Sequence, residues 1–173
     1  MSDVSTDPPT KEPLGAWLAL LQAQAAVTDA VEAELVAGSE LPLAWHEVLV
    51  RLARAGGRMR MRELAQAVLL SKSGLTRLAD RMEEAGLLER SACATDRRGT
   101  FAVLTKSGRS VLRRSTPVFR RAVEANLADH LTADELTSLR SLLEKVAQGS
   151  GRADEVCDPS DLGEPRGATK TPA

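Results

Sequence analysis

The sequence predicts a mainly α-helical domain that carries one small β-hairpin. Apolar residues recur with the helical period over most of residues 14–148, and the period changes to two only around residues 87–104. Six of the eight prolines lie before residue 14 or after residue 148. We therefore expect one folded domain at residues 14–148 of the 173-residue chain, between disordered tails at 1–13 and 149–173.

The first half of this domain is expected to contain four helices. An alanine-rich helix covers residues 14–37, and Pro42 opens a second one that Gly56-Gly57 stops. A short helix follows at residues 62–68. Ser71 is a suitable N-cap for the next helix, 72–85, and a glycine at position 86 suits its C-terminal end.

The second half begins with the hairpin. Strands are expected at residues 87–91 and 100–104, on either side of a basic loop. A long helix then starts at Thr105, and Pro117 should bend it. The capping-box sequence from Thr132 to Glu135 starts the last helix.

The composition excludes several classes of function. Two cysteines and two histidines are too few for a disulfide scaffold or a metal cage, and 2% aromatic residues do not supply stacking platforms for single-stranded nucleic acid. No phosphate-binding glycine motif and no nucleophile–base arrangement occurs, so we expect no enzyme, no catalytic residue, no metal and no cofactor. The longest uncharged apolar run, Leu14 to Thr28, is short for a membrane span, and no signal peptide is evident. The protein is expected to be cytoplasmic, with no membrane partner.

The net charge of −1 conceals an uneven distribution along the chain. Residues 1–56 carry a net charge of −5, residues 57–115 carry +7, and residues 116–173 carry −3. A basic segment between acidic ends is typical of proteins that bind a polyanion, although a solvated basic face has the same composition.

The order helix, turn, helix and basic hairpin over residues 42–105 predicts a winged helix-turn-helix. In its second helix one face is apolar and the outward face is polar. The polar residues lie mostly in the N-terminal half, which is the half that reaches base edges in the major groove. Taken alone, the pattern of that helix is equally typical of an ordinary amphipathic surface helix. The basic hairpin tip, taken alone, is equally typical of a solvated loop. Their occurrence together in the only basic segment favours binding of double-stranded DNA. The residues expected to contact DNA are Ser71, Lys72, Ser73, Thr76, Arg77 and Arg81 in the recognition helix and Asp96, Arg97 and Arg98 in the wing.

From about Leu14 to Val146 the sequence resembles the MarR family of bacterial transcriptional regulators. The most specific similarity is the wing sequence DRRG at residues 96–99 followed by LTKSG at 104–108. Residues 69–78 resemble the family's recognition region, and residues 61–65 its preceding helix. Arg62 departs from the family pattern, which often has a capping Ser or Thr there.

The resemblance implies a homodimer whose terminal helices, about 14–37 and 106–148, interlock and whose two lobes read a palindromic operator. It also implies that Arg97 or Arg98 enters the minor groove while Asp96 holds the other arginine.

The effector site and the thiol are less defined. A crevice between the dimer helices and the basic lobe would involve Trp17, Trp45, His46 and Arg51, which suit a small aromatic or amphipathic anion. Core or dimer packing of the tryptophans, and a partly exposed helix histidine, are the simpler interpretations. Cys93 beside the wing could respond to oxidants, since arginines nearby favour its thiolate.

The function that we expect is a sequence-specific DNA-binding regulator, a homodimeric repressor that a small ligand releases from its operator. The alternatives are a winged helix used for protein–protein docking and an architectural DNA binder with little sequence preference.

Overall fold

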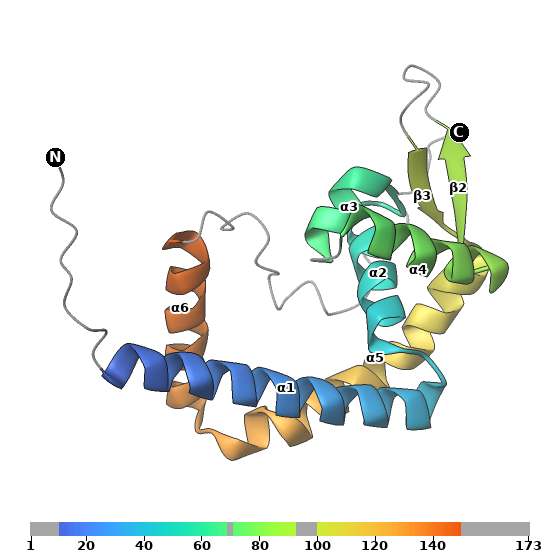
Figure 1. Ribbon diagram of the computed structural model, residues 1–173. Coiled ribbons are helices and arrows are strands. Elements are labelled where there is room, and N and C mark those ends of the chain that lie inside the picture. The colour runs from blue at the N-terminus through green and yellow to red at the C-terminus, as the bar shows by residue number, and fades with distance from the viewer. Residues whose placement is uncertain (1–10, 69–70, 93–99, 150–173) are drawn as a thin grey trace, which may run out of the picture.

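The computed structural model describes residues 11–68, 71–92 and 100–149 (Figure 1). In chain order its elements are α1 (Lys11–Ser39), α2 (Leu43–Arg54), β1 (Arg58–Arg60), α3 (Met61–Ala67), α4 (Lys72–Glu84), β2 (Leu88–Ala92), β3 (Thr100–Leu104), α5 (Lys106–Asn126), the 3-10 turn η1 (Ala128–His130) and α6 (Ala133–Gly149). The mainly helical fold with a small antiparallel sheet confirms the predicted class. The lobe formed by α2 to β3 stands at one end of an arm formed by α1, α5 and α6 (Figure 1).

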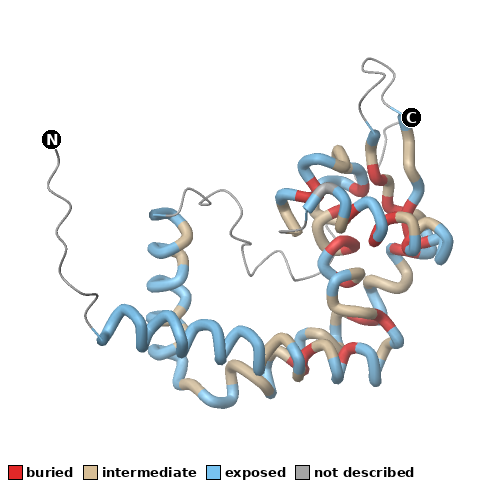
Figure 2. Tube along the Cα trace, viewed as in Figure 1, coloured by how far each residue is buried: buried red, intermediate tan, exposed pale blue. Residues whose placement is uncertain are grey.

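The lobe contains the main hydrophobic core. Buried apolar residues from α2, α3, α4 and the sheet form one cluster, which includes Leu49, Leu64, Leu75, Met82 and Leu88. Figure 2 shows these buried segments gathered in the lobe, whereas the first half of α1 and most of α6 are exposed. The lobe therefore has the larger core, and the described part of the arm buries only a few residues, among them Val31, Leu35 and Ala122.

The sheet has three antiparallel strands in the order β1-β3-β2. The hairpin strands were predicted, and β3 has the expected bounds; β1 was not predicted because its three residues, Arg58 to Arg60, are too few to show an alternating pattern. The Arg58 guanidinium lies 3.8 Å from the centroid of the Phe101 ring, so the edge strand is joined to β3 by a cation–π contact as well as by the ladder.

The predicted helix caps are present. The Ser71 hydroxyl accepts a hydrogen bond from the Gly74 amide at 3.0 Å, and Gly86 adopts a φ of +68° after α4. At α6 the Glu135 carboxylate accepts a hydrogen bond from the Thr132 amide at 2.8 Å, which is the expected capping box. Pro117 lies inside α5, which runs through it as one helix.

The start of α5 is locked to the end of α4. The Thr105 hydroxyl accepts a hydrogen bond from the Gly108 amide at 2.9 Å and donates to the Gly86 carbonyl at 2.7 Å. Gly108 is buried, and a Cβ there would collide with the Leu87 carbonyl oxygen and the Leu104 side chain. This close approach explains the glycine of the LTKSG sequence.

In the arm, α1 packs along α5 through its second half. Val31 and Leu35 are buried there, and Gly38 faces Val118 so closely that a Cβ would contact the Val118 side chain at 2.8 Å. The helix begins at Lys11, three residues before the expected start, and extends to Ser39. This length corrects the membrane argument from the sequence: among the described residues, α1 is long and apolar enough to cross a membrane, with a mean hydropathy of 1.2 over 18 residues.

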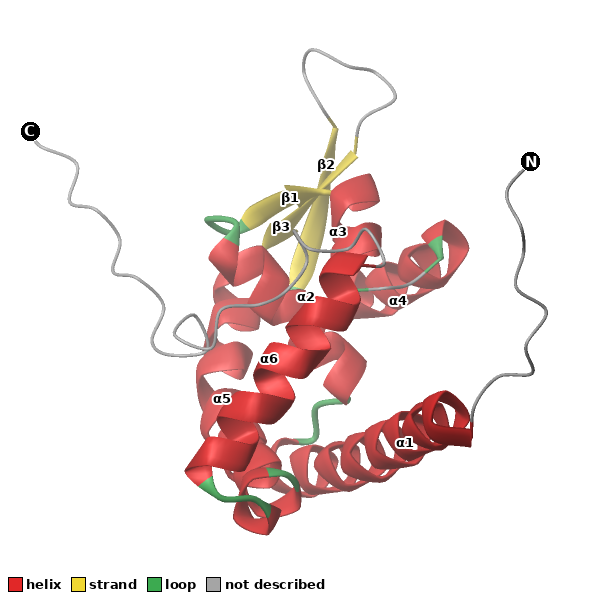
Figure 3. Ribbon diagram, turned by 90° about the vertical axis from the view of Figure 1, so that its left-hand side faces the viewer, coloured by secondary structure: helices red, strands yellow, loops and turns green. Residues whose placement is uncertain are grey.

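The helix α6 stands apart from α1. The two cross in Figure 1, but after the 90° turn of Figure 3 they are separate. Both helices expose large apolar side chains, among them Trp17, Leu18 and Leu142, which are 56%, 56% and 61% exposed. The two ends of the described chain thus present large apolar side chains to solvent.

Candidate nucleic-acid interface

The helix α4 divides into a buried face and an exposed face. Leu75, Leu78, Ala79 and Met82 are buried in the lobe core, as the sequence predicts. The residues exposed to solvent are Ser71, Ser73, Thr76, Arg77 and Arg81, while the side chain of Lys72 lies outside the description. Five of the six expected recognition residues therefore lie at the surface of the lobe, on or directly before one helix.

The exposed face of α4 is hollowed. An open depression of about 590 Å³ is lined by Gly74, Arg77, Asp80 and Arg81. The missing side chain at Gly74 and two guanidinium groups leave a surface into which the edge of a base or a phosphate can fit. Asp80 makes this surface mixed in charge.

Arg90 on β2 joins the wing to α4, and sequence analysis did not assign it this role. One of its guanidinium nitrogens donates a hydrogen bond to the Asp80 carboxylate, and the other donates to the Thr76 carbonyl at 3.0 Å. Its backbone amide donates to the Glu83 carboxylate at 2.8 Å. These bonds fix the rotation of α4 relative to the hairpin. The signal in the sequence was the two acids at positions 80 and 83, which lie one turn apart on the helix that otherwise presents the expected DNA-binding residues.

The wing tip lies outside the described residues. Asp96, Arg97, Arg98 and Cys93 all fall in the gap between residues 92 and 100. The strands that carry this loop are ordered next to α4, with Arg90 paired to Ala102 in the sheet. Arg62, the departure from the family pattern, is exposed in the first turn of α3; the N-cap position is Arg60, whose side chain makes no capping hydrogen bond.

The structure does not bring the four expected effector residues of the chain together. Trp17 is exposed on the first half of α1, and Trp45 packs partly buried against the lobe core. Arg51 lines a different hollow, between α2 and α3. Of the four, only Trp45 and His46 are neighbours, on the same turn of α2.

His46 is buried between α2 and α5 rather than partly exposed. Its Nδ1 atom lies 2.9 Å from the Ser115 hydroxyl, its ring stacks on Phe119 with centroids 4.6 Å apart, and its Nε2 atom has no hydrogen-bond partner among the described residues. Burial lowers the pKa of His46 from 6.5 to about 4. The ring is therefore neutral at pH 7 and joins the lobe to the arm.

Together, the capped and half-exposed α4, the hairpin beside it and the arginines on the same face define a winged helix-turn-helix protein of the DNA-binding class. The profile of the MarR family matches residues 39–99. The structure of Sco3205 from Streptomyces coelicolor, a MarR family transcriptional regulator in complex with DNA, is similar with a TM-score of 0.77 and 32% identity, covering 85% of this chain and 92% of that one.

Two further structures have the same fold. AbsC, a MarR family regulator from Streptomyces coelicolor, is 35% identical with a TM-score of 0.75, covering 84% of this chain and 99% of that one. BpsR from Bordetella bronchiseptica, whose DNA binding is regulated by 6-hydroxynicotinic acid, is 20% identical with a TM-score of 0.68 over 77% of this chain and 98% of its own. The chain thus belongs to the MarR family and is a DNA-binding transcriptional regulator.

Proposed function

We propose that this regulator is a cytoplasmic homodimeric repressor that binds a palindromic operator and is released by a small ligand. The observation that carries the proposal is α4, whose apolar face is fixed in the lobe core while Ser73, Thr76 and Arg77 are exposed. A helix presented in this way is suited to the major groove.

Within the interface we assign different roles to helix and wing. Ser73, Thr76 and Arg77 read base edges, and Ser71, Lys72 and Arg81 help to position the helix. Arg97 or Arg98 enters the minor groove, and Asp96 holds the other arginine. This assignment rests on their order in the sequence and, for the helix, on exposure; the wing residues lie outside the described part of the chain.

The exposed apolar faces of α1 and α6 support the homodimer. Six large apolar residues on α1 and three on α6 are exposed, and they lie at opposite ends of the chain. Contiguous apolar surface on a soluble protein marks an interaction site, and burying it against a second copy contributes about 25 cal/mol per Å². Two lobes related by a two-fold axis then match a palindrome.

A ligand acts on such a dimer only if it binds one spacing of the lobes better than the other. The crevice between arm and lobe is the place where such a difference arises. We propose that Trp45 and His46 lie at this crevice on the lobe side. Arg51 lines the separate hollow against α3 and Trp17 lies on the first half of α1, so these two residues of the same chain are not part of it. The regulation of BpsR by 6-hydroxynicotinic acid makes that compound a sensible first probe.

Filter binding at one fixed salt concentration tests the function. We expect the protein to retain a duplex enriched by selection from a random pool more tightly than an unselected duplex of equal length, by a factor of about 10³ or more. Equal retention of both duplexes would contradict sequence-specific regulation and favour the architectural alternative.

A further inference from the structure

Over residues 106–121 the exposed side of α5 carries six cations and no acid. Its buried side is marked by Gly108, Ser115 and Ala122, which recur every seven residues. The cations, all of them exposed, are Lys106, Arg109, Arg113, Arg114, Arg120 and Arg121. They extend along about 24 Å of the helix. We refer to these six residues as the basic stripe.

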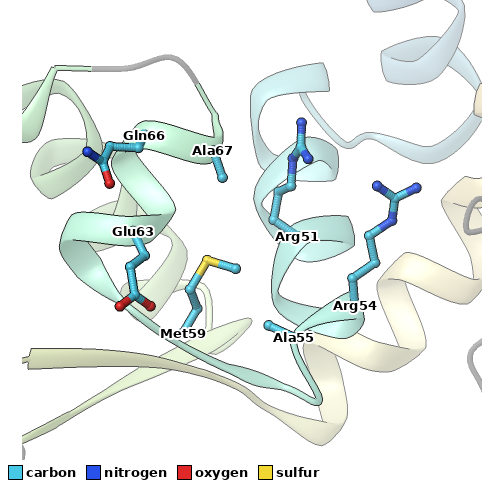
Figure 4. Close-up of a pocket in the computed structure, with 7 residues that line it drawn as sticks. All are labelled: Arg51, Arg54, Ala55, Met59, Glu63, Gln66 and Ala67. Carbon is cyan, nitrogen blue, oxygen red and sulfur yellow. The ribbon is translucent and has the colours of Figure 1, made fainter. Parts of the chain in front are cut away.

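Several other cations of the described chain have acids beside them. Arg90 is paired with Asp80 and Glu83, and Arg140 is paired with Glu144. A hollow of about 420 Å³ between α2 and α3 has two arginines on one side and an acid on the other (Figure 4). Its lining includes Arg51, Arg54, Met59, Glu63 and Ala67. By contrast, no residue of the basic stripe makes a hydrogen bond or an ion pair through its side chain within the described residues.

The basic stripe is unfavourable for the helix on its own. Lys106 lies in the first turn of α5, where the helix dipole favours acids, and that turn contains none. Arg109 and Arg113 are four residues apart, so two like charges are neighbours on the helix surface. A bound anion relieves both effects, and the stripe is therefore suited to a polyanionic partner.

The basic stripe leads away from the DNA-binding face. In Figure 1 the strands β2 and β3 extend from the lobe in one direction, and α5 leads from the lobe into the arm in the other. A duplex on α4 and the hairpin thus does not follow the stripe along the arm. The stripe suits an anion other than the DNA that α4 contacts.

The chain itself contains such an anion. Residues 154–164, DEVCDPSDLGE, include five acids and no base, and they lie beyond Gly149, the last residue that the structure describes. Glu164 comes 15 residues after Gly149, and 15 extended residues span up to about 50 Å. This exceeds the length of α1, the longest helix of the arm, which is about 43 Å. The 11 residues of the segment, up to about 36 Å long, can also cover the whole stripe.

We propose that residues 154–164 bind the basic stripe of α5 as an internal polyanion and keep random DNA off the arm. Carboxylates form charge-assisted hydrogen bonds with guanidinium groups, and five acids match six cations closely in number. Weak contacts with random DNA are then confined to the lobe. The inference uses only the DNA-binding class of the protein and requires neither a palindrome nor a ligand.

Paramagnetic NMR on the full chain tests the contact itself. A nitroxide is attached to Cys157, inside the acidic segment, after Cys93→Ser has left it as the only thiol. We expect the label to broaden the amide signals of residues 106–121 at 50 mM NaCl. The broadening should disappear in 1 M NaCl, where charges are screened beyond about 3 Å.

Matched variants identify the partner of the segment. Arg113→Gln together with Arg120→Gln removes two charges from the stripe and should reduce the broadening of α5. Lys11→Gln together with Lys145→Gln removes two exposed charges from other helices and should leave it unchanged. The amide spectrum shows that each variant is folded. The site is overturned if α5 is not broadened, if the broadening lies on α4 instead, or if both double variants reduce it equally.

Filter binding with a random duplex at 50 mM NaCl tests the consequence. Changing the five acids of residues 154–164 to Asn or Gln should strengthen retention about ten-fold and steepen its salt dependence, because the stripe becomes available to phosphates. Adding Arg113→Gln and Arg120→Gln to this variant should remove most of the gain, whereas the same pair in the original protein should have little effect. Equal effects of the pair in both backgrounds would mean that DNA, and not the acidic segment, occupies the stripe. Unchanged retention after loss of the five acids would overturn the shielding role.

Discussion

Arg77 is the residue at which base reading and backbone attraction can be separated. It is exposed near the middle of α4. If it bonds a guanine edge, Arg77→Ala should weaken specific binding by about 1–3 kcal/mol while binding to random DNA changes little. Arg97→Ala and Arg98→Ala should instead weaken both and make the salt dependence shallower, because phosphate neutralisation is lost. Equal losses on both duplexes for Arg77→Ala, measured by filter binding, would assign it to the phosphate contacts.

We expect Arg90 to act on DNA through α4 and not by contact. Its guanidinium is held by Asp80 and the Thr76 carbonyl, so Arg90→Met should release α4 from the hairpin and weaken specific binding. Because the lost charge is not at a phosphate, we expect the slope of log affinity against log salt to remain unchanged. A slope that falls by about one, as for a phosphate contact, would show that Arg90 reaches the DNA itself.

His46 makes stability depend on pH. Burial lowers its pKa from 6.5 to about 4, so between these values the unfolded chain binds a proton that the folded chain does not. The contribution of neutral His46 to the free energy of unfolding is complete above pH 6.5 and is lost as the pH falls towards 4. At 1.36 kcal/mol per pH unit, the total loss is roughly 3 kcal/mol. Urea unfolding at pH 7 and pH 4.5 should show a larger loss for the original protein than for His46→Gln. Identical losses would mean that the histidine is protonated in the folded state.

At the scale of elements, the junction between the wing and α5 depends on the glycine at position 108. A Cβ there meets the Leu87 backbone, which cannot move aside, so Gly108→Ala should destabilise the protein by roughly 1–3 kcal/mol. Gly15→Ala is the matched control: nothing lies within 4 Å of the added carbon, and alanine favours a helix by about 0.5–1 kcal/mol. Thermal unfolding should therefore move in opposite directions for the two substitutions. A destabilised Gly15→Ala with an unaffected Gly108→Ala would contradict the packing described.

Local signals explain which elements were predicted from the sequence. The helices of the lobe, the Ser71 cap, the capping box at Thr132 and the hairpin strands each depend on residues within a few positions of one another. The strand β1 was missed because three residues carry no periodicity and their partner is β3, more than 40 positions away. The pairing of His46 with Ser115 was missed for the same reason, since 69 positions separate the two residues. The Arg90 bonds were missed because they join a strand to a helix 10 and 14 positions earlier, and no local pattern shows how these two elements pack.

The predicted effector residues illustrate a further limit. Chain order placed Trp17, Trp45, His46 and Arg51 near one crevice, but side-chain direction decides contact. On α2, residues 46 and 51 are five positions apart and point to different neighbours, His46 to α5 and Arg51 to the gap against α3. The hollow at Arg51 was not foreseen because Met59 and Ala67 carry no signal of their own.

At the scale of the whole molecule, the exposed apolar faces of α1 and α6 predict the assembly. Light scattering at micromolar concentration should give twice the 18.5 kDa mass of one chain. Leu142→Glu together with Leu143→Glu should give a monomer or an unfolded chain, because both side chains are exposed in one protomer and would be buried in the dimer. Ser138→Glu, an exposed polar position on the same helix, is the control. A monomer that still binds DNA specifically would contradict the homodimer.

The central claim is that two copies of this lobe read one symmetric DNA sequence. Selection of bound duplexes from a random pool, followed by sequencing, tests it most directly. The account predicts an enriched palindrome whose half-sites are centred about one helical turn apart, or a multiple of it. Enrichment of a single unsymmetric site, or no enrichment over the starting pool, would contradict it.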